Sequence, residues 1–348
     1  MRTTACAIPD AQTLPVRVSP VGLTGSDPME SYLSWASRLA WSNGYRSVQR
    51  LLRAEGLPAA PDSDLGQEEH RRRLVRLAGF DDSLLVPLTV LVFPTSSCGI
   101  QRRAGPGSRW MLRRESAEPG APHQVCSQCL AEANVPYWTM NSRRSYVTQC
   151  AKHSALLLNH CPECGVQLTI SMKRTAELHQ CATCRFDLRC AEDSALSSAE
   201  QVPQHWMDFD AATPHPCAPG LIEKDAFWAG VKVILDAIYR QAIAEKLMRI
   251  PAVESFHRLF EKILAHPSWS FDHHDVNCRH QALLFMKWLL EDWDSRVSGI
   301  RSMMDIRDAI KYSRTNSTTW PQEYFRAHSF IEHIPLEERY ARSLVKST

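Results

Sequence analysis

Residues 126–184 read CSQCLAEANVPYWTMNSRRSYVTQCAKHSALLLNHCPECGVQLTISMKRTAELHQCATC, and they contain four pairs of soft metal ligands with two residues inside each pair. That spacing lets one tight turn direct two side chains at the same tetrahedral ion. The gaps between pairs are 20 residues in the first unit and 16 in the second; the second gap falls in the usual zinc-ribbon window and the first lies at its edge. Sequential pairing predicts a three-cysteine, one-histidine site and then a four-cysteine site, formed by Cys126, Cys129, Cys150, His153, Cys161, Cys164, Cys181 and Cys184.

In each predicted site the protein supplies all four ligands and leaves no position for water or substrate. This is typical of structural rather than catalytic zinc, so the sequence predicts two structural Zn²⁺ ions. Disulfides or unrelated thiols are the alternatives, but no secretion signal indicates an oxidising compartment. His160 and Cys190 are possible substitutes if the pairing differs.

Several of these segments resemble the TniQ family, which comprises target-selection proteins of transposons related to those that use TnsD. The most specific is Cys150 to Gly165, with the pattern Cys-x-x-His-x-x-x-Leu-Leu-x-x-Cys-Pro-x-Cys-Gly. The segments from Cys126, from Cys181 and from Glu30 to Gly44 carry the resemblance further. Ser127 and Ala182 stand where the family usually has proline, and neither change removes a ligand.

The whole chain has the composition of a globular protein, with 348 residues, 44% hydrophobic and 22% charged. This length suits more than one domain. We expect an N-terminal helical domain over 1–120, a tandem zinc region over 121–190 and a helical domain over 191–348. The longest apolar run is too short to cross a membrane, and no signal peptide is visible, so a cytoplasmic protein is expected.

The amino-terminal part predicts a helix-turn-helix. One helix is expected from Pro28, capped by Asp27, to Asn43-Gly44, and a second from Ser47 to Glu55. The second helix presents a polar face that could read bases in a major groove, or could simply be solvated, through Arg46, Gln49, Arg50 and Arg53. A third helix over 67–77 could contact phosphates through Arg71, Arg72, Arg73 and Arg76, although a solvated charge run is the alternative.

The carboxy-terminal half predicts a helical bundle, with helices over 226–248, 251–264, 280–293 and 300–312 and a short one after Trp320. A polar cluster over 272–280 does not match a standard metal pattern and is interpreted as a capped loop of surface histidines. The predicted fold class is therefore mainly α, with small zinc-ribbon modules between two helical domains.

No catalytic motif of the phosphate-loop, metalloprotease or serine-hydrolase type occurs, so the sequence predicts a binding protein rather than an enzyme. The resemblance implies an adaptor that links a target-recognition module to a TnsC-like AAA+ ATPase and the transposase. The target module is either a CRISPR Cascade-type effector complex, on which family members often ride as dimers, or a DNA site.

Two observations favour recruitment through the effector complex over direct reading. No long carboxy-terminal extension of the TnsD kind is seen, and residues 1–190 hold only 22 Lys and Arg against 16 Asp and Glu. The competing interpretation is a free-standing zinc-containing transcription regulator that binds DNA, for which the helix-turn-helix and the mild basicity would suffice.

Overall fold

The computed structural model describes residues 16–21, 30–56, 68–81, 120–171, 177–207, 213–214, 221–222, 224–266, 270–293 and 295–296. These residues fall into two compact units. The first unit runs to Gln201 and includes Asp275–Arg279, and the second contains Val202–His274 and the chain from His280.

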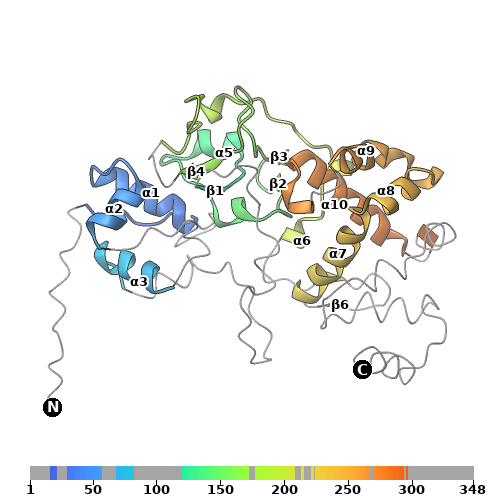
Figure 1. Ribbon diagram of the computed structural model, residues 1–348, viewed down its shortest axis with the longest axis horizontal. Coiled ribbons are helices and arrows are strands. Elements are labelled where there is room, and N and C mark those ends of the chain that lie inside the picture. The colour runs from blue at the N-terminus through green and yellow to red at the C-terminus, as the bar shows by residue number, and fades with distance from the viewer. Residues whose placement is uncertain are drawn as a thin grey trace, which may run out of the picture. The chain divides into compact units, whose positions relative to one another are not determined.

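The first unit contains short helices and two-residue or three-residue strands (Figure 1). β1 pairs antiparallel with β4, with Ala121 opposite Ile170, and β2 pairs antiparallel with β3, with Cys150 opposite Ala155. In chain order the elements are α1 (Tyr32–Ser42), α2 (Val48–Ala54), α3 (Glu68–Leu77), β1 (Gly120–Pro122), α5 (Ser127–Glu132), the 3-10 helix η3 (Met140–Arg143), β2 (Gln149–Cys150), β3 (Ala155–Leu156), β4 (Thr169–Ser171), η4 (Leu188–Cys190) and η5 (Ser198–Glu200).

Helix α1 begins at Tyr32, so the predicted start at Pro28 is wrong. Ser31 is the N-cap, and its hydroxyl accepts a hydrogen bond from the backbone N–H of Ser34. Glu30 is extended and forms a bridge with Thr139 instead of continuing the helix. The buried Glu30 carboxylate also accepts hydrogen bonds from the Ser34 hydroxyl and from Arg38, which satisfies its charge.

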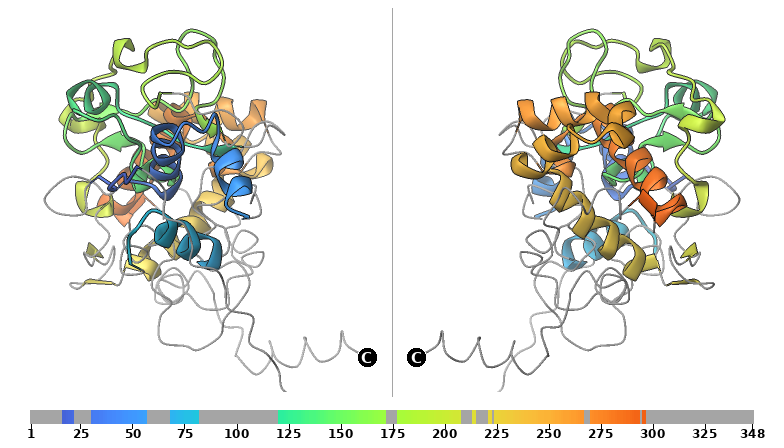
Figure 2. Two further views of the ribbon diagram at one scale, coloured as in Figure 1. Left: turned by 90° about the vertical axis from the view of Figure 1, so that its left-hand side faces the viewer. Right: turned by 90° about the vertical axis from the view of Figure 1, so that its right-hand side faces the viewer.

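Helix α2 follows the prediction closely. Ser47 is its N-cap, and the Ser47 hydroxyl accepts from the backbone N–H of Arg50 at 3.1 Å. Gly44, with a φ of +76°, closes the turn between α1 and α2. Val48, Leu51 and Leu52 face the core. Helices α1, α2 and α3 lie near one another (Figure 2).

The three helices and the cysteine-rich region share one hydrophobic core. From the helices come Trp35, Leu39, Leu51 and Leu74, all of them fully buried. The cysteine-rich region contributes Val125, Leu130, Trp138, Leu168, Ile170, Leu178 and Leu188. The helices α1–α3 and the cysteine-rich region therefore fold against one another.

Trp138 joins the two parts of this core by hydrogen bonds as well as by packing. Its backbone N–H donates to the Ser34 hydroxyl at 3.0 Å, and its carbonyl accepts from the Ser31 N–H at 2.8 Å. The indole Nε1–H donates to the Leu178 carbonyl at 2.6 Å. The ring is 3% exposed and contacts the edge of His123. Trp138 therefore ties α1 to the segment that precedes Cys181.

A second buried polar network holds residues 275–279 within the first unit. The Arg279 guanidinium is fully buried and donates to the Ser145 carbonyl and, at 2.9 Å, to Gln124 Oε1. Gln124 Nε2 in turn donates to the Arg144 carbonyl at 2.7 Å. Asn159 Oδ1 accepts from the backbone N–H of Val276. The sequence contained no sign of this arrangement, because arginines are expected at the surface.

The second unit is mostly helical, and aromatic side chains form much of its core. Its elements are α6 (Gln204–Met207), β5 (Thr213–Pro214), β6 (Leu221–Ile222), α7 (Lys224–Ile238), α8 (Gln241–Leu247), η6 (Pro251–Phe256), α9 (His257–Ala265), η7 (Phe271–His273) and the part of α10 (Val276–Glu291) from His280 onward. β5 pairs antiparallel with β6. Trp206 packs against Phe227 and Trp228, and Phe285 packs against Phe256 and Phe260.

Two helix predictions in this unit are wrong. The single helix expected over 226–248 is divided into α7 and α8, because Arg240 adopts an extended conformation after the buried Tyr239. α10 begins at Val276 rather than at His280, since Asp275 Oδ1 caps it by accepting from the Cys278 N–H at 2.7 Å. His274 and His280, interpreted as surface histidines, are buried.

The structure is mostly helical, as predicted, with two clusters of cysteine and histidine in the first unit. The helix-turn-helix, the zinc-ribbon modules and the division at 120 and 190 stay predictions. The helices expected over 300–312 and after Trp320 lie outside the described residues. Among the residues described, no helix combines the length and the apolar character needed to cross a membrane.

Candidate metal centre

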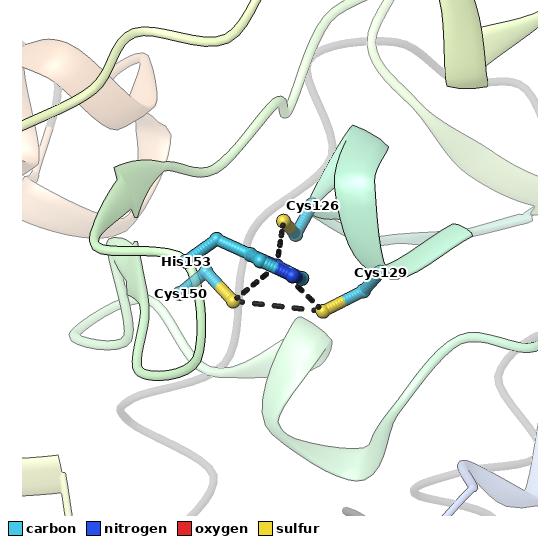
Figure 3. Close-up of side chains that lie close together, drawn as sticks. All are labelled: Cys126, Cys129, Cys150 and His153. Atoms are coloured by element: carbon cyan, nitrogen blue, oxygen red, sulfur yellow. Dashed lines mark hydrogen bonds between the residues drawn. The ribbon is translucent and has the colours of Figure 1, made fainter. Parts of the chain in front are cut away.

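The first cluster contains Cys126, Cys129, Cys150 and His153 (Figure 3). Cys126 immediately precedes α5 and Cys129 lies in its first turn, so one helix start positions both sulfurs. Cys150 ends β2, and the turn after it carries His153. The Nδ1 atom of His153 lies 3.3 Å from the sulfurs of Cys126 and Cys129 and 3.6 Å from that of Cys150.

These distances fit a tetrahedral zinc site. Bond lengths of about 2.3 Å to sulfur and about 2.0 Å to nitrogen place tetrahedral sulfur and nitrogen about 3.5 Å apart, and two sulfurs about 3.8 Å apart. The sulfurs of Cys129 and Cys150 are separated by 3.6 Å. The four side chains are therefore spaced as ligands of one ion would be.

The second cluster contains Cys161, Cys164, Cys181 and Cys184. The sulfurs of Cys161 and Cys184 are 3.5 Å apart, and those of Cys164 and Cys181 are 3.8 Å apart. These values again match a tetrahedral sulfur set. Cys161 and Cys181 are buried, and both belong to the shared hydrophobic core.

Three of the four half-sites use the same turn. The residue after the second ligand has a positive φ in each: 47° at Ser154, 70° at Gly165 and 67° at Arg185. Its N–H donates to the carbonyl of the first ligand, at 2.9, 2.8 and 3.0 Å respectively. The half-site of Cys126 differs because its second ligand is inside a helix. The repeated turn directs both side chains of each pair to one point.

The thiols of the metal-free protein cannot all ionise together. Hydrogen bonds from Cys126 and then from Cys129 lower the pKa of Cys150 to about 2. Hydrogen bonds with Cys126 and then Cys150 raise the pKa of Cys129 far above its ordinary value. Burial raises the pKa of Cys161 to about 12. A dication would stabilise the remaining thiolates, so its binding would release protons.

The comparison with known families identifies the segment that contains the first cluster. Residues 24–157 match the sequence model of the family described as TniQ. This segment is similar to the TniQ family, and we refer to it as the TniQ domain. The resemblance predicted from the motifs is thereby confirmed. None of the curated proteins compared with the chain matches it.

The TniQ domain includes α1–α3 and the whole first cluster, and it ends before Cys161. The sequential pairing of half-sites is the one that the structure brings together. His160 and Cys190 are not members of either cluster. In the part of the chain that the structure describes, these are the only groups of at least three such side chains close enough to hold a metal ion.

The arginines predicted to contact nucleic acid or a partner lie on the TniQ domain at some distance along the chain from the clusters. Arg46, Arg50 and Arg53 are exposed on or beside α2, and Gln49 is half-buried. On α3, Arg73 and Arg76 are exposed and Arg72 is half-buried. The side chain of Arg71 lies outside the described residues. The structure thus leaves five of these arginines accessible to a partner.

Sequence reasoning missed one residue beside the first cluster. Glu132, at the end of α5, lies with its Oε2 atom 3.1 Å from Nε2 of His153. Glu132 belongs to no pair with x2 spacing, so the ligand pattern does not point to it. The i, i+3 relation of Glu132 to Cys129 places both residues on one side of α5, but the contact with His153 depends on the tertiary fold.

Proposed function

We propose that this chain is a target-selection adaptor for DNA transposition, which links a target-recognition module to a TnsC-like AAA+ ATPase and, through it, to the transposase. The TniQ domain over residues 24–157 is the observation that carries the proposal. TniQ is a family of non-catalytic adaptors, so we assign the chain a binding role rather than an enzymatic one.

We further propose that both clusters hold structural zinc. Each offers four soft ligands at tetrahedral spacing, which would leave no coordination position for substrate or water. Cys161 and Cys181 lie in the same core as α1–α3. Zinc would therefore crosslink the loops against which the amino-terminal helices pack, and would hold the adaptor surface in shape.

The exposed face of α2 and α3 is the part of the described surface that we propose for partner or nucleic-acid contact. Arg46, Arg50, Arg53, Arg73 and Arg76 can each contact a phosphate or a carboxylate. α2 has 7 residues, which is short for a helix that reads a major groove. We therefore favour recruitment by an RNA-guided effector of the Cascade kind over direct reading of a DNA site.

The test combines two binding measurements on the zinc-loaded protein. The first measures whether the protein joins a Cascade-type effector and a TnsC-like ATPase in the presence of ATP. The second selects random duplex DNA over several rounds across a salt series. We expect co-assembly in the first and no enriched motif in the second. Failure to bind either the ATPase or the effector would overturn the adaptor proposal.

Matched triple variants show whether the arginine face is used. Arg46, Arg50 and Arg53 are changed to alanine in one protein. Lys246, Arg249 and Arg258, which are exposed in the second unit, are changed in the control. Only the first variant is expected to weaken co-assembly.

The second candidate function is a free-standing transcription regulator, and the exposed arginines beside α2 are the observation that favours it. One enriched motif, bound without an ATPase and with an affinity that falls steeply as salt rises, would support that function instead.

A further inference from the structure

His153 presents its two ring nitrogens to different surroundings. Nδ1 faces the three sulfurs of the first cluster at 3.3 to 3.6 Å, so a metal ion there would take Nδ1 and leave the proton on Nε2. Nε2 is buried and has no aligned hydrogen bond. A buried imidazole N–H that carries part of a metal's charge needs an acceptor.

Glu132 offers that acceptor. Its Oε2 atom lies 3.1 Å from Nε2 of His153, and the same oxygen contacts Nζ of Lys152. The Glu132 side chain is 51% exposed, so a small rotation can align it with the ring N–H. The contacts with Lys152 and then with His153 lower the pKa of Glu132.

We propose that Glu132 is the outer carboxylate of the first metal site, and that it holds the His153 ring in place and increases the basicity of Nδ1. This inference rests on the proposed zinc binding. A carboxylate behind a metal-bound imidazole orients the ring and strengthens its bond to the metal. Because α5 carries both Cys129 and Glu132, one helix supplies a ligand and the support for another ligand. Glu132 is thus a positioning residue.

The experiment compares Glu132→Ala and Glu132→Gln with the wild-type full chain. Zinc content is measured first, and two ions per chain are expected. Competition with a chromophoric chelator then gives the affinity of each site, and Co²⁺ spectra distinguish the three-sulfur site from the four-sulfur site. Glu163→Ala is the matched control, because Glu163 is an exposed glutamate inside the second cluster's Cys-x2-Cys turn.

Glu132→Ala is expected to weaken the first site by about 10- to 100-fold and to leave the second site unchanged. Glu132→Gln, which keeps an acceptor but loses the charge, is expected to fall between Glu132→Ala and wild type. ¹⁵N chemical shifts of His153 should report a weaker hydrogen bond at Nε2 in both variants.

Wild-type affinity and ring shifts in both Glu132 variants, with two zinc ions still bound, would overturn this inference alone. The inference would also be overturned if Glu163→Ala lowered the zinc affinity of the first site as much as Glu132→Ala does. A wild-type protein that binds no zinc would overturn the zinc proposal together with it.

Discussion

Gly165 and Arg185 occupy the same place in the two half-sites of the second cluster, but only one of them is a glycine. Their φ values are 70° and 67°, and each N–H closes the same turn onto the first cysteine of its pair. A residue with a Cβ pays about 1–2 kcal/mol in this left-handed region. Exchanging the residue types should therefore shift the stability of the turn in opposite directions.

Gly165→Ala isolates the backbone term, because a Cβ at Gly165 would meet nothing within 4 Å. Alanine also lowers the conformational entropy of the unfolded chain, which offsets about 0.4–1 kcal/mol of this cost. The net cost is about 0.8 kcal/mol at the midpoints of these ranges and about 0–1.6 kcal/mol at their extremes. Arg185→Gly should stabilise the turn by a similar amount, since the Arg185 side chain is exposed and little packing is lost.

These energies should appear in the zinc affinity of the second site, because metal binding and closure of the turn are coupled. The midpoint cost corresponds to about a fourfold change in the dissociation constant of the second site, and the upper extreme to about fifteenfold. Chelator competition measures it, and the first site in the same protein is the internal reference. The double variant should lie close to wild type. If Arg185→Gly weakens zinc binding, or if Gly165→Ala strengthens it, the assignment of strain to these two positions is wrong.

Three further outcomes follow from the first unit. Trp138→Phe keeps most of the aromatic ring but removes the donor to the Leu178 carbonyl. We therefore expect the free energy of unfolding, measured by urea denaturation, to fall by about 1–3 kcal/mol, and no change would contradict the burial of this hydrogen bond. Arg279→Met leaves the Ser145 carbonyl and the Gln124 amide oxygen without their buried donor. It should lower the free energy of unfolding of the first unit by about 2–4 kcal/mol in the same assay, and an unchanged urea midpoint would contradict this. Zinc affinity of the first cluster should fall as pH falls, because two of its three thiols, with raised pKa values, must lose protons to bind metal. Calorimetry in buffers of different ionisation enthalpy counts the released protons, and a zinc affinity that does not change with pH would refute this prediction.

The metal clusters were predictable because ligand chemistry leaves a local pattern. An x2 pair needs only one turn to bring its two side chains together, and the gap lengths then limit which pairs can meet. The cap at Ser47 was predictable for the same reason, since its partner is three residues away. Local rules fail where a distant segment competes. Glu30 pairs with Thr139, and that contact, over a hundred residues away, moves the start of α1.

Long-range polar contacts were not predictable at all. Arg279 reads as an ordinary residue on a helix, and nothing in its neighbours indicates that it is buried against Ser145 and Gln124. Glu132 likewise acquires its place beside His153 only when two half-sites fold together. The contacts of such residues depend on the tertiary structure, because their partners lie on loops that come together only when the clusters form.

The TniQ domain and the folding unit do not have the same limits. The matched segment ends at residue 157, between the two clusters. Yet Trp138, inside it, is hydrogen-bonded to Leu178, outside it, and the core that contains Trp35 also contains Cys161 and Cys181. A chain cut at 157 would expose Trp138 and leave its indole N–H without that acceptor. The second cluster is therefore part of what holds the matched helices in place, and zinc bound there would stabilise a surface formed by residues far earlier in the chain.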